Sequence, residues 1–121
     1  MAQKDYYQVV IVGGGTAGIT VAAQLCRMMS PPEIAIIEPS EKHYYQPIWT
    51  LVGAGVFPRE ISERETKDVI PPGVTWMKDR VTLFDPDNNA LTTEMGKKLH
   101  YGYLVVAAGI QLDWAKIPGL K

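Results

Sequence analysis

The apolar positions in the first part of the chain change from a strand-like to a helix-like spacing and back again. Residues 7–12 are nearly all apolar and rich in β-branched side chains, which is typical of a parallel strand covered on both faces. Residues 16–29 place apolar side chains three and four positions apart, which predicts a helix packed on the sheet. Residues 33–38 form a second short apolar run. The order strand, helix, strand predicts one βαβ unit, right-handed by the general rule.

The remaining sequence mixes weaker patterns. Residues 39–58 have no regular period and predict a long irregular segment, while residues 59–70 indicate a polar helix that ends at the Pro-Pro-Gly of residues 71–73. Residues 85–89 carry the side chains favoured by a type I turn, so the neighbouring strands should form an antiparallel β-meander hung from the sheet. Strands are expected over residues 74–77, 80–84, 90–93 and 98–101, with a last buried strand over residues 103–108.

Composition narrows the class of protein. The chain has 121 residues, of which 46% are apolar and 21% charged, and this suits one soluble globular domain. The net charge of −1, without a dense Lys/Arg cluster, argues against nucleic acid as a partner, and no apolar run approaches the roughly 20 residues that span a bilayer. The single cysteine, Cys26, excludes an internal disulfide and a multi-cysteine zinc site. We expect a reducing, cytosol-like compartment and no structural metal.

The strongest candidate site is Gly-Gly-Gly-Thr-Ala-Gly at residues 13–18, a G-x-G-x-x-G motif between the first predicted strand and the first predicted helix. Gly13 allows the tight turn, Gly15 lets a pyrophosphate approach the backbone, and Gly18 lets helix and strand pack closely. The start of the helix, at Thr16 and Ala17, would bind the phosphates through unpaired N–H groups and the positive end of the helix dipole. Such a motif alone can be a flexible loop, but its position favours nucleotide binding.

An acidic residue stands at the position that contacts ribose in such folds. Glu38 ends the second predicted strand, 20 residues after Gly18. Its carboxylate would accept hydrogen bonds from a ribose diol and repel a 2′-phosphate, which favours FAD or NAD over NADP. Glu41 and Glu33 are better explained as solvated surface charges.

The end of the chain favours FAD over NAD. Residues 104–109, Leu-Val-Val-Ala-Ala-Gly, resemble the apolar strand ending in Ala-Thr-Gly that flavoproteins with two dinucleotide domains carry, with Ala108 in place of Thr. The alternative is a plain buried strand stopped by Gly109. A plain NAD dehydrogenase gives no reason for a β-meander before this strand. Together these features predict an α/β fold, a Rossmann-type FAD-binding half-domain with a parallel sheet and an inserted antiparallel β-meander.

A narrower resemblance begins after the second strand. Residues 38–55, Glu-Pro-Ser-Glu-Lys-His-Tyr-Tyr-Gln-Pro-Ile-Trp-Thr-Leu-Val-Gly-Ala-Gly, resemble the sulfide:quinone oxidoreductase family, in the branch that includes the mitochondrial enzymes and their bacterial relatives. With the glycine motif, Arg80-Val81 and residues 104–117, the resemblance covers nearly the whole chain. It implies that residues 13–18 hold the FAD pyrophosphate and Glu38 the adenosine ribose.

The resemblance also implies further cofactor contacts. Gln46 would lie along the cofactor, Val81 would meet the adenine through its backbone, and Ala108-Gly109 would return the chain to the flavin. Without the family, Gln46 is equally well an ordinary loop residue and Val81 plain strand core. Three aromatic residues could line a flavin or quinone pocket, but aromatic residues in a long loop more often only pack against it; they are Tyr44, Tyr45 and Trp49. His43 and His100 are expected to be hydrogen-bonding loop residues without a catalytic role.

The chemistry implied by the resemblance is two-electron oxidation of sulfide, with sulfane sulfur passed to an acceptor and electrons passed through FAD to quinone. It requires a reactive thiolate beside the flavin. Cys26 lies on the apolar stripe of the predicted helix and should be buried away from the flavin, so no catalytic residue is assigned within the chain. We expect residues 1–121 to be the truncated N-terminal part of an FAD/NAD(P)-binding Rossmann domain, inactive alone.

The redox cysteines, the quinone pocket and the membrane-contacting part would then follow Lys121, after a loop-like stop. The parent protein would act on the cytoplasmic side, peripherally at the inner membrane. Two alternatives stay open. The chain could be the same segment of a type II NADH:quinone oxidoreductase or another pyridine-nucleotide-dependent flavoprotein, or it could be a non-enzymatic nucleotide-binding module.

Overall fold

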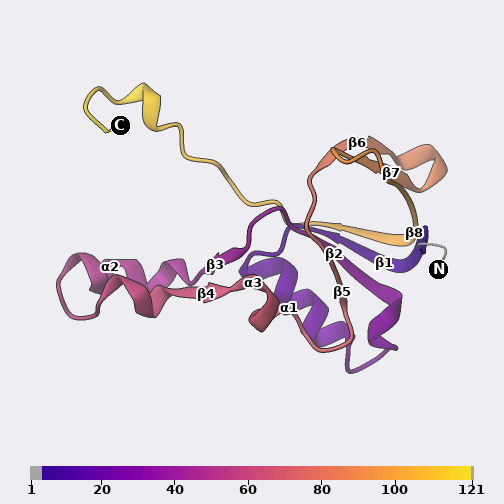
Figure 1. The fold of residues 1–121 in the computed structure, drawn as a ribbon, viewed down its shortest axis with the longest axis horizontal. Coiled ribbons are helices and arrows are strands. Elements are labelled where there is room, and N and C mark those ends of the chain that lie inside the picture. The colour runs from indigo at the N-terminus through magenta and orange to yellow at the C-terminus, as the bar shows by residue number, and fades with distance from the viewer. Residues whose placement is uncertain (1–3, 121) are drawn as a thin grey trace.

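A six-stranded sheet organises the chain in the computed structural model, which describes residues 4–120 (Figure 1). Its strand order is β5-β2-β1-β8-β7-β6. The strands β5, β2, β1 and β8 run parallel, and β7 and β6 follow as antiparallel neighbours of β8. The predicted α/β fold, a parallel sheet with an attached antiparallel meander, is therefore confirmed. The strand bounds are β1 (Tyr6–Val12), β2 (Ile34–Ile37), β5 (Thr75–Met77), β6 (Val81–Asp85), β7 (Ala90–Thr93) and β8 (Lys98–Val106).

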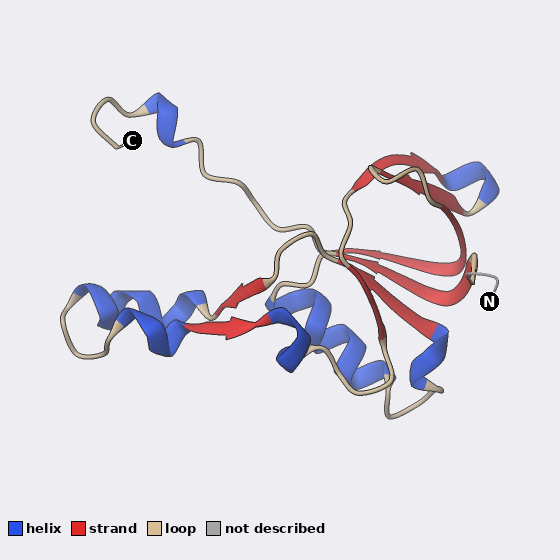
Figure 2. Ribbon diagram, in the orientation of Figure 1, coloured by secondary structure: helices blue, strands red, loops and turns tan. Residues whose placement is uncertain are grey.

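The core lies on both faces of the central strands β1 and β2. On one face, α1 (Thr16–Leu25) packs on Ile11, Ile34 and Ile36, which have no exposed surface. On the other face, the meander curls over the sheet (Figure 2), and Leu91 and Leu99 join the alternate side chains of β1 and β2 in a second apolar cluster. Strands covered on both faces read as unbroken apolar runs, which explains why these two were predictable.

The first helix ends four residues earlier than predicted. It stops at Leu25, whereas the apolar spacing extends to Met29. After the helix, the N–H of Arg27 bonds to the carbonyl of Gln24 and that of Met28 to the carbonyl of Leu25, both three residues back, so the chain tightens into turns. Pro31 follows in the short 3₁₀-helix η1 (Pro31–Glu33), and a proline disfavours helical backbone in the residue before it.

The predicted helix over residues 59–70 is wrong. This segment forms the 3₁₀-helix η3 (Arg59–Ser62), the strand β4 (Glu63–Glu65) and the short helix α3 (Thr66–Val69). β4 pairs in antiparallel fashion with β3 (Lys42–Tyr44), a strand inside the segment expected to be irregular. The segment is extended because β4 pairs with β3. Since β3 lies about 20 residues upstream, a local sequence window does not reveal this pairing.

The chain between β3 and β4 carries two further short helices, η2 (Gln46–Ile48) and α2 (Trp49–Gly53). We call residues 42–65 the ribbon arm. Figure 1 shows that it projects from the sheet beside α1, with α2 near its tip. Its apolar side chains are largely exposed, among them Leu51 and Val56.

The strand β8 differs from prediction in two ways. Residues 98–101 and 103–108 were expected as two strands, but they form one strand that pairs with β7 at its start and with β1 along its length. The second half was expected to be buried, yet Tyr103 is 67% and Val106 60% exposed. Tyr103 is exposed because α1 covers the sheet beside β8 rather than β8 itself, leaving an apolar groove of about 620 Å³ lined by Tyr103, Val21 and Val105 among others. Val106 lies on the opposite face and lines the cavity at the strand ends.

Cys26, expected in the core, is only partly buried at the end of α1, where it packs against the cluster beneath the helix. Two short 3₁₀-helices remain, η4 (Pro86–Asn88) and η5 (Trp114–Lys116), and the segment after β8 extends away from the sheet (Figure 1). Lys121, the last residue of the expected terminal loop, lies outside the described residues. Residues 4–120 contain no helix long and apolar enough to cross a bilayer.

Candidate functional site

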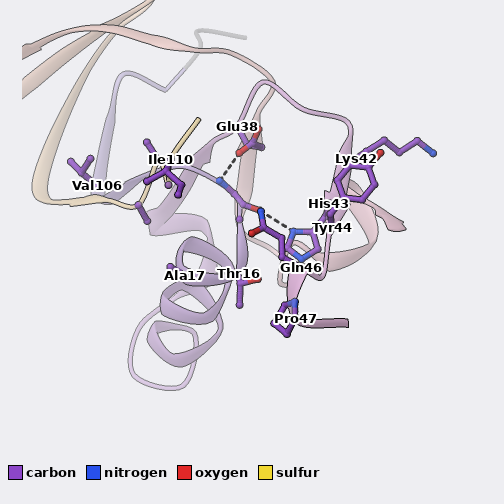
Figure 3. Close-up of a pocket in the computed structure, with 15 residues that line it drawn as sticks. Thr16, Ala17, Glu38, Lys42, His43, Tyr44, Gln46, Pro47, Val106 and Ile110 are labelled. Atoms are coloured by element: carbon purple, nitrogen blue, oxygen red, sulfur yellow. Dashed lines mark hydrogen bonds between the residues drawn. The ribbon is translucent and has the colours of Figure 1, made fainter. Parts of the chain in front are cut away.

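A cavity of about 910 Å³ opens where the parallel strands β1, β2 and β8 end (Figure 3). Three segments and one acid line it: residues 14–17 after β1, Glu38 after β2, residues 106–110 at the end of β8, and residues 42–44 with 46–47 from the ribbon arm. In open α/β sheets, ligands bind outside the carboxyl ends of the strands because the loops there converge. The cavity therefore lies where this fold class places its ligand.

The glycine loop, residues 13–18, is shaped by close backbone approaches. Gly13 has a φ of +105°, and a Cβ added there would lie 2.2 Å from the carbonyl oxygen of Ala107. A Cβ on Gly18 would lie 1.9 Å from the carbonyl oxygen of Gly13. Gly15 differs, because a Cβ there would meet no heavy atom within 4 Å. Gly13 and Gly18 thus allow tight packing, whereas Gly15 leaves open space at the cavity wall.

The start of α1 suits an anion. Gly15 is the N-cap residue, and among the described residues no side chain caps this end of the helix and no acid lies in its first turn. Thr16 and Ala17, which begin the helix, line the cavity. A helix N-terminus leaves its first N–H groups without intrahelical partners and carries a partial positive charge. The residues present therefore fit a phosphate-bearing ligand such as a dinucleotide.

Glu38 is held in place by two backbone N–H groups. Gly14 donates to Oε2 and Ser40 donates to Oε1, each at 2.8 Å (Figure 3 shows the first contact). Each carboxylate oxygen can accept a further hydrogen bond, so the group stays available to a diol. A Cβ on Gly14 would lie 2.8 Å from Cβ and Cγ of Glu38, so this glycine also makes room for the acid.

The other acids near the second strand behave as expected. Glu41 is 64% exposed and forms an ion pair with Lys78, and Glu33 is also exposed. The hydrogen bond from Lys78 and its charge lower the pKa of Glu41. The interpretation of both acids as surface charges is confirmed.

The ribbon arm forms the opposite wall through polar contacts. Lys42 bridges the two acids of β4, at 3.1 Å from Glu63 Oε1 and in an ion pair with Glu65. The hydrogen bonds to Glu65 and Glu63 raise the pKa of Lys42, and those from Lys42 and from the Tyr44 hydroxyl lower the pKa of Glu63. His43 Nδ1 lies 3.3 Å from the carbonyl oxygen of Gly14, which joins the arm to the glycine loop.

The structure brings most of the expected site residues together. The expected residues that line the cavity are Gly15, Thr16, Ala17, Glu38, Gln46, Ala108 and Gly109. Gly13 and Gly18, at the two ends of the loop, do not line the cavity, but their close backbone contacts set the path of the loop. Val81 does not line the cavity; it packs partly buried against the core cluster of the meander side.

Of the three aromatic residues considered for a pocket, only Tyr44 lines the cavity. Trp49 packs against Tyr44 with ring centroids 6.1 Å apart, and Tyr45 is 53% exposed. His43 makes a hydrogen bond as expected, but from a strand rather than a loop, and His100 lies in β8.

Sequence reasoning missed several lining residues. They are Lys42, Pro47, Val106, Ala107 and Ile110. The signal for Lys42 was the alternation Glu63-Arg64-Glu65, which offers two acids on one face of a strand to a cation on a paired strand. The described part of the chain holds no group of three His, Cys, Asp or Glu side chains that could bind a metal ion.

Comparisons with known proteins show the family of this chain. Residues 7–121 match the family model of the pyridine nucleotide-disulphide oxidoreductases. The mitochondrial sulfide:quinone oxidoreductase of Dictyostelium discoideum is 52% identical over 119 residues, 98% of this chain and 26% of that protein. The mitochondrial enzyme of Mus musculus is 51% identical over 117 residues, 97% of this chain and 26% of that protein. The chain thus spans about a quarter of the length of these relatives.

A solved structure of a sulfide:quinone oxidoreductase is also similar to this chain. The crystal structure of the sulfide:quinone oxidoreductase from Aquifex aeolicus matches with a TM-score of 0.73 and 28% identity, over 88% of this chain and 25% of that one. The resemblance to sulfide:quinone oxidoreductases is therefore confirmed, and the family implies a flavin cofactor. The chain belongs to the pyridine nucleotide-disulphide oxidoreductase family.

Proposed function

We propose that this chain is the FAD-binding segment of a flavoprotein that oxidises sulfide and passes the electrons to quinone. The observation that carries the proposal is the cavity at the strand ends, where an open glycine, an uncapped helix N-terminus and a preoriented carboxylate meet. The choice of sulfide and quinone rests on relatives that are 51–52% identical and carry those substrates in their names. The cavity supports a dinucleotide, and the likeness supports the reaction.

Different residues of the cavity would bind different parts of FAD. The N–H groups at Gly15, Thr16 and Ala17 would hold the pyrophosphate, because they combine free donors with the positive end of α1. Glu38 would accept hydrogen bonds from the ribose hydroxyls while its two backbone partners keep it oriented. Gln46 would lie along the cofactor.

Ala108 and Gly109 would bring the chain to the flavin end, since they continue the last strand of the parallel group. The proposed adenine contact of Val81 has less support, because Val81 lies outside the cavity lining.

The flavin would supply a two-electron acceptor for sulfide and a donor for quinone. Sulfide would leave as sulfane sulfur on an acceptor, and this step needs a thiolate close to the flavin. Cys26 does not line the cavity, so this chain would provide binding and orientation rather than the thiolate. Quinones are apolar, so we propose that the parent protein acts peripherally at a membrane. The named relatives are mitochondrial, and the side of the membrane stays a prediction.

The test uses the full-length protein, loaded with FAD and kept free of oxygen. Sulfide should bleach the visible flavin spectrum, and a quinone should restore it. Glu38→Gln should still fold and should weaken FAD binding by roughly tenfold, because a charge-assisted hydrogen bond to the ribose is lost. Failure to bind FAD would overturn the whole proposal. A flavin that ignores sulfide but is bleached by NADH would overturn the assigned substrate and leave the cofactor.

A further inference from the structure

Gly14 is held at the wall of the cavity by two side chains from different parts of the chain, one on each of its two peptide groups. Glu38 accepts the N–H of Gly14 at 2.8 Å, and the ring of His43 lies 3.3 Å from the Gly14 carbonyl oxygen (Figure 3). The first side chain follows β2, and the second comes from β3 of the ribbon arm. Gly14 is therefore the point at which the arm contacts the glycine loop.

The contact with the carbonyl oxygen indicates which ring nitrogen of His43 carries a proton. A carbonyl oxygen only accepts hydrogen bonds, so the close Nδ1 must carry a proton and donate. In the neutral ring, Nε2 is then the acceptor. His43 is thus a hydrogen-bond donor toward the loop and not a base for it.

The Gly14 carbonyl shares a rigid peptide plane with the N–H of Gly15. Because the two groups belong to one plane, a donor that holds the carbonyl also fixes the direction of the Gly15 N–H. This restraint matters at this position, because glycine has wide backbone freedom and even a Cβ on Gly15 would meet no heavy atom within 4 Å. Gly15 is also the N-cap of α1, so its orientation sets the start of the helix.

The strand that carries the His43 ring is anchored by pairing and by side-chain contacts. His43 pairs with Arg64 in the β3–β4 register, and Lys42 and Tyr44 on either side bond to the acids of β4. The hydroxyl of Thr66, which is 1% exposed, donates to the carbonyl of Ser40 at 2.8 Å and ties the base of the arm to the segment before β3. The histidine therefore lies on a strand whose residues are all paired with β4.

We propose that His43 is a positioning residue of the diphosphate site: its Nδ1–H fixes the Gly14–Gly15 peptide so that the loop is already arranged for a diphosphate. The inference rests on the proposed nucleotide binding and names a residue on which the affinity for the diphosphate depends. An ordered loop pays less conformational entropy on binding, so loss of the donor should weaken ligands that carry a diphosphate and spare those that lack one.

The test compares three variants of the full-length protein without flavin. His43→Phe keeps a ring and removes the donor, His43→Asn keeps an N–H donor near the position of Nδ1, and His100→Phe is the matched control on β8. Binding of FAD, ADP and adenosine is measured by calorimetry. His43→Phe should bind FAD and ADP roughly five- to tenfold more weakly and adenosine within about twofold of the parent, whereas His43→Asn and His100→Phe should resemble the parent.

A second readout needs no ligand. Hydrogen–deuterium exchange of residues 13–18 should be faster in His43→Phe than in the parent and close to the parent in His43→Asn. Unchanged ADP affinity and exchange in His43→Phe would overturn the inference alone, as would an equal loss for adenosine or a failure of His43→Asn to restore binding. A parent protein that binds neither FAD nor ADP would overturn the proposed function, and the inference with it.

Discussion

The cavity has two walls that are built by different forces. The glycine loop follows β1, whose Val10 and Ile11 have no exposed surface, and its path is set by backbone contacts too close for any side chain. The ribbon arm on the other side is held by side chains that water reaches, such as Lys42, which is 43% exposed between Glu63 and Glu65. One wall belongs to the core and the other is attached to it.

This difference shows that one part of a binding site can be as stable as the core while another part opens more easily. Buried apolar strands contribute most of the folding free energy, so the loop they carry stays ordered with or without ligand. Exposed ion pairs contribute little to stability, and an arm that depends on them opens locally at small cost. We expect changes at the tightly packed glycines of the loop wall to destabilise the whole fold, whereas changes in the arm wall should affect the arm and, through His43, the glycine loop, with little effect on global stability.

The largest expected effect comes from Gly13→Ala. The methyl group would have to overlap the Ala107 carbonyl on a backbone with φ of +105°, so the free energy of unfolding should fall by at least about 3 kcal/mol. Urea denaturation measures the change. The control is Gly15→Ala, whose φ of −74° and open surroundings should cost less than about 1 kcal/mol of stability.

Gly15→Ala should nevertheless weaken FAD binding by at least about tenfold, because its methyl group would occupy the approach of the phosphates. Equal stability losses in the two glycine variants would contradict the distinction between packing glycines and the open glycine.

A second comparison removes apolar side chains from each region. Ile11→Ala should lower the free energy of unfolding by about 2–5 kcal/mol, because it leaves a cavity in a fully buried site. Leu51→Ala, on α2 of the ribbon arm, removes a side chain that is 43% exposed and should cost less than about 1 kcal/mol. Denaturation curves with equal slopes check both values. A large loss for Leu51→Ala would mean that the arm is part of the core.

Lys42→Met should loosen the arm while leaving global unfolding nearly unchanged. The substitution keeps an unbranched side chain and removes the charge that bridges Glu63 and Glu65. Hydrogen exchange should therefore become faster in residues 42–65 and stay the same in β1 and β2. Lys78→Met is the control, because it breaks an exposed ion pair with Glu41 outside the arm. Faster exchange throughout the sheet would contradict the separation of the two walls.

The smallest expected effect is the dependence of the arm on pH. Hydrogen bonds from Lys42 and then Tyr44 lower the pKa of Glu63 from its ordinary value of 4.5, so its ionised form stabilises the folded arm. This contribution is fully present above the ordinary pKa and is lost as the pH falls through the lowered one. Exchange of residues 42–65, corrected for intrinsic rates, should therefore rise in acid. Glu63→Gln should remove this rise, and an unchanged pH profile in that variant would contradict the assignment.

The loop wall was predictable because its causes are local. The apolar run of β1, the glycine spacing and Glu38 at the end of β2 each lie within a short window, and the structure brings their residues to one cavity. The arm wall was not predictable in the same way. Glu63 and Glu65 become strand residues only because Lys42–Tyr44 lies beside them, and a polar window with no partner in view favours a helix instead.

The same limit applies to the second half of β8 and to His43. The apolar run of residues 103–108 indicates a strand, but the exposure of Tyr103 depends on where α1 lies across the sheet. A lone histidine gives no sign of its partner, and the Gly14 carbonyl that it contacts is 29 residues away.

For this protein, the sequence by itself determined the parallel strands, the first helix, the glycine loop and the acid that follows β2, because periodicity, steric demand and charge act between near neighbours. Only the tertiary structure decided the ribbon arm, the open face of β8 and the contact between His43 and Gly14. Those features depend on which distant segments meet, and that outcome is fixed by the packing of the whole sheet.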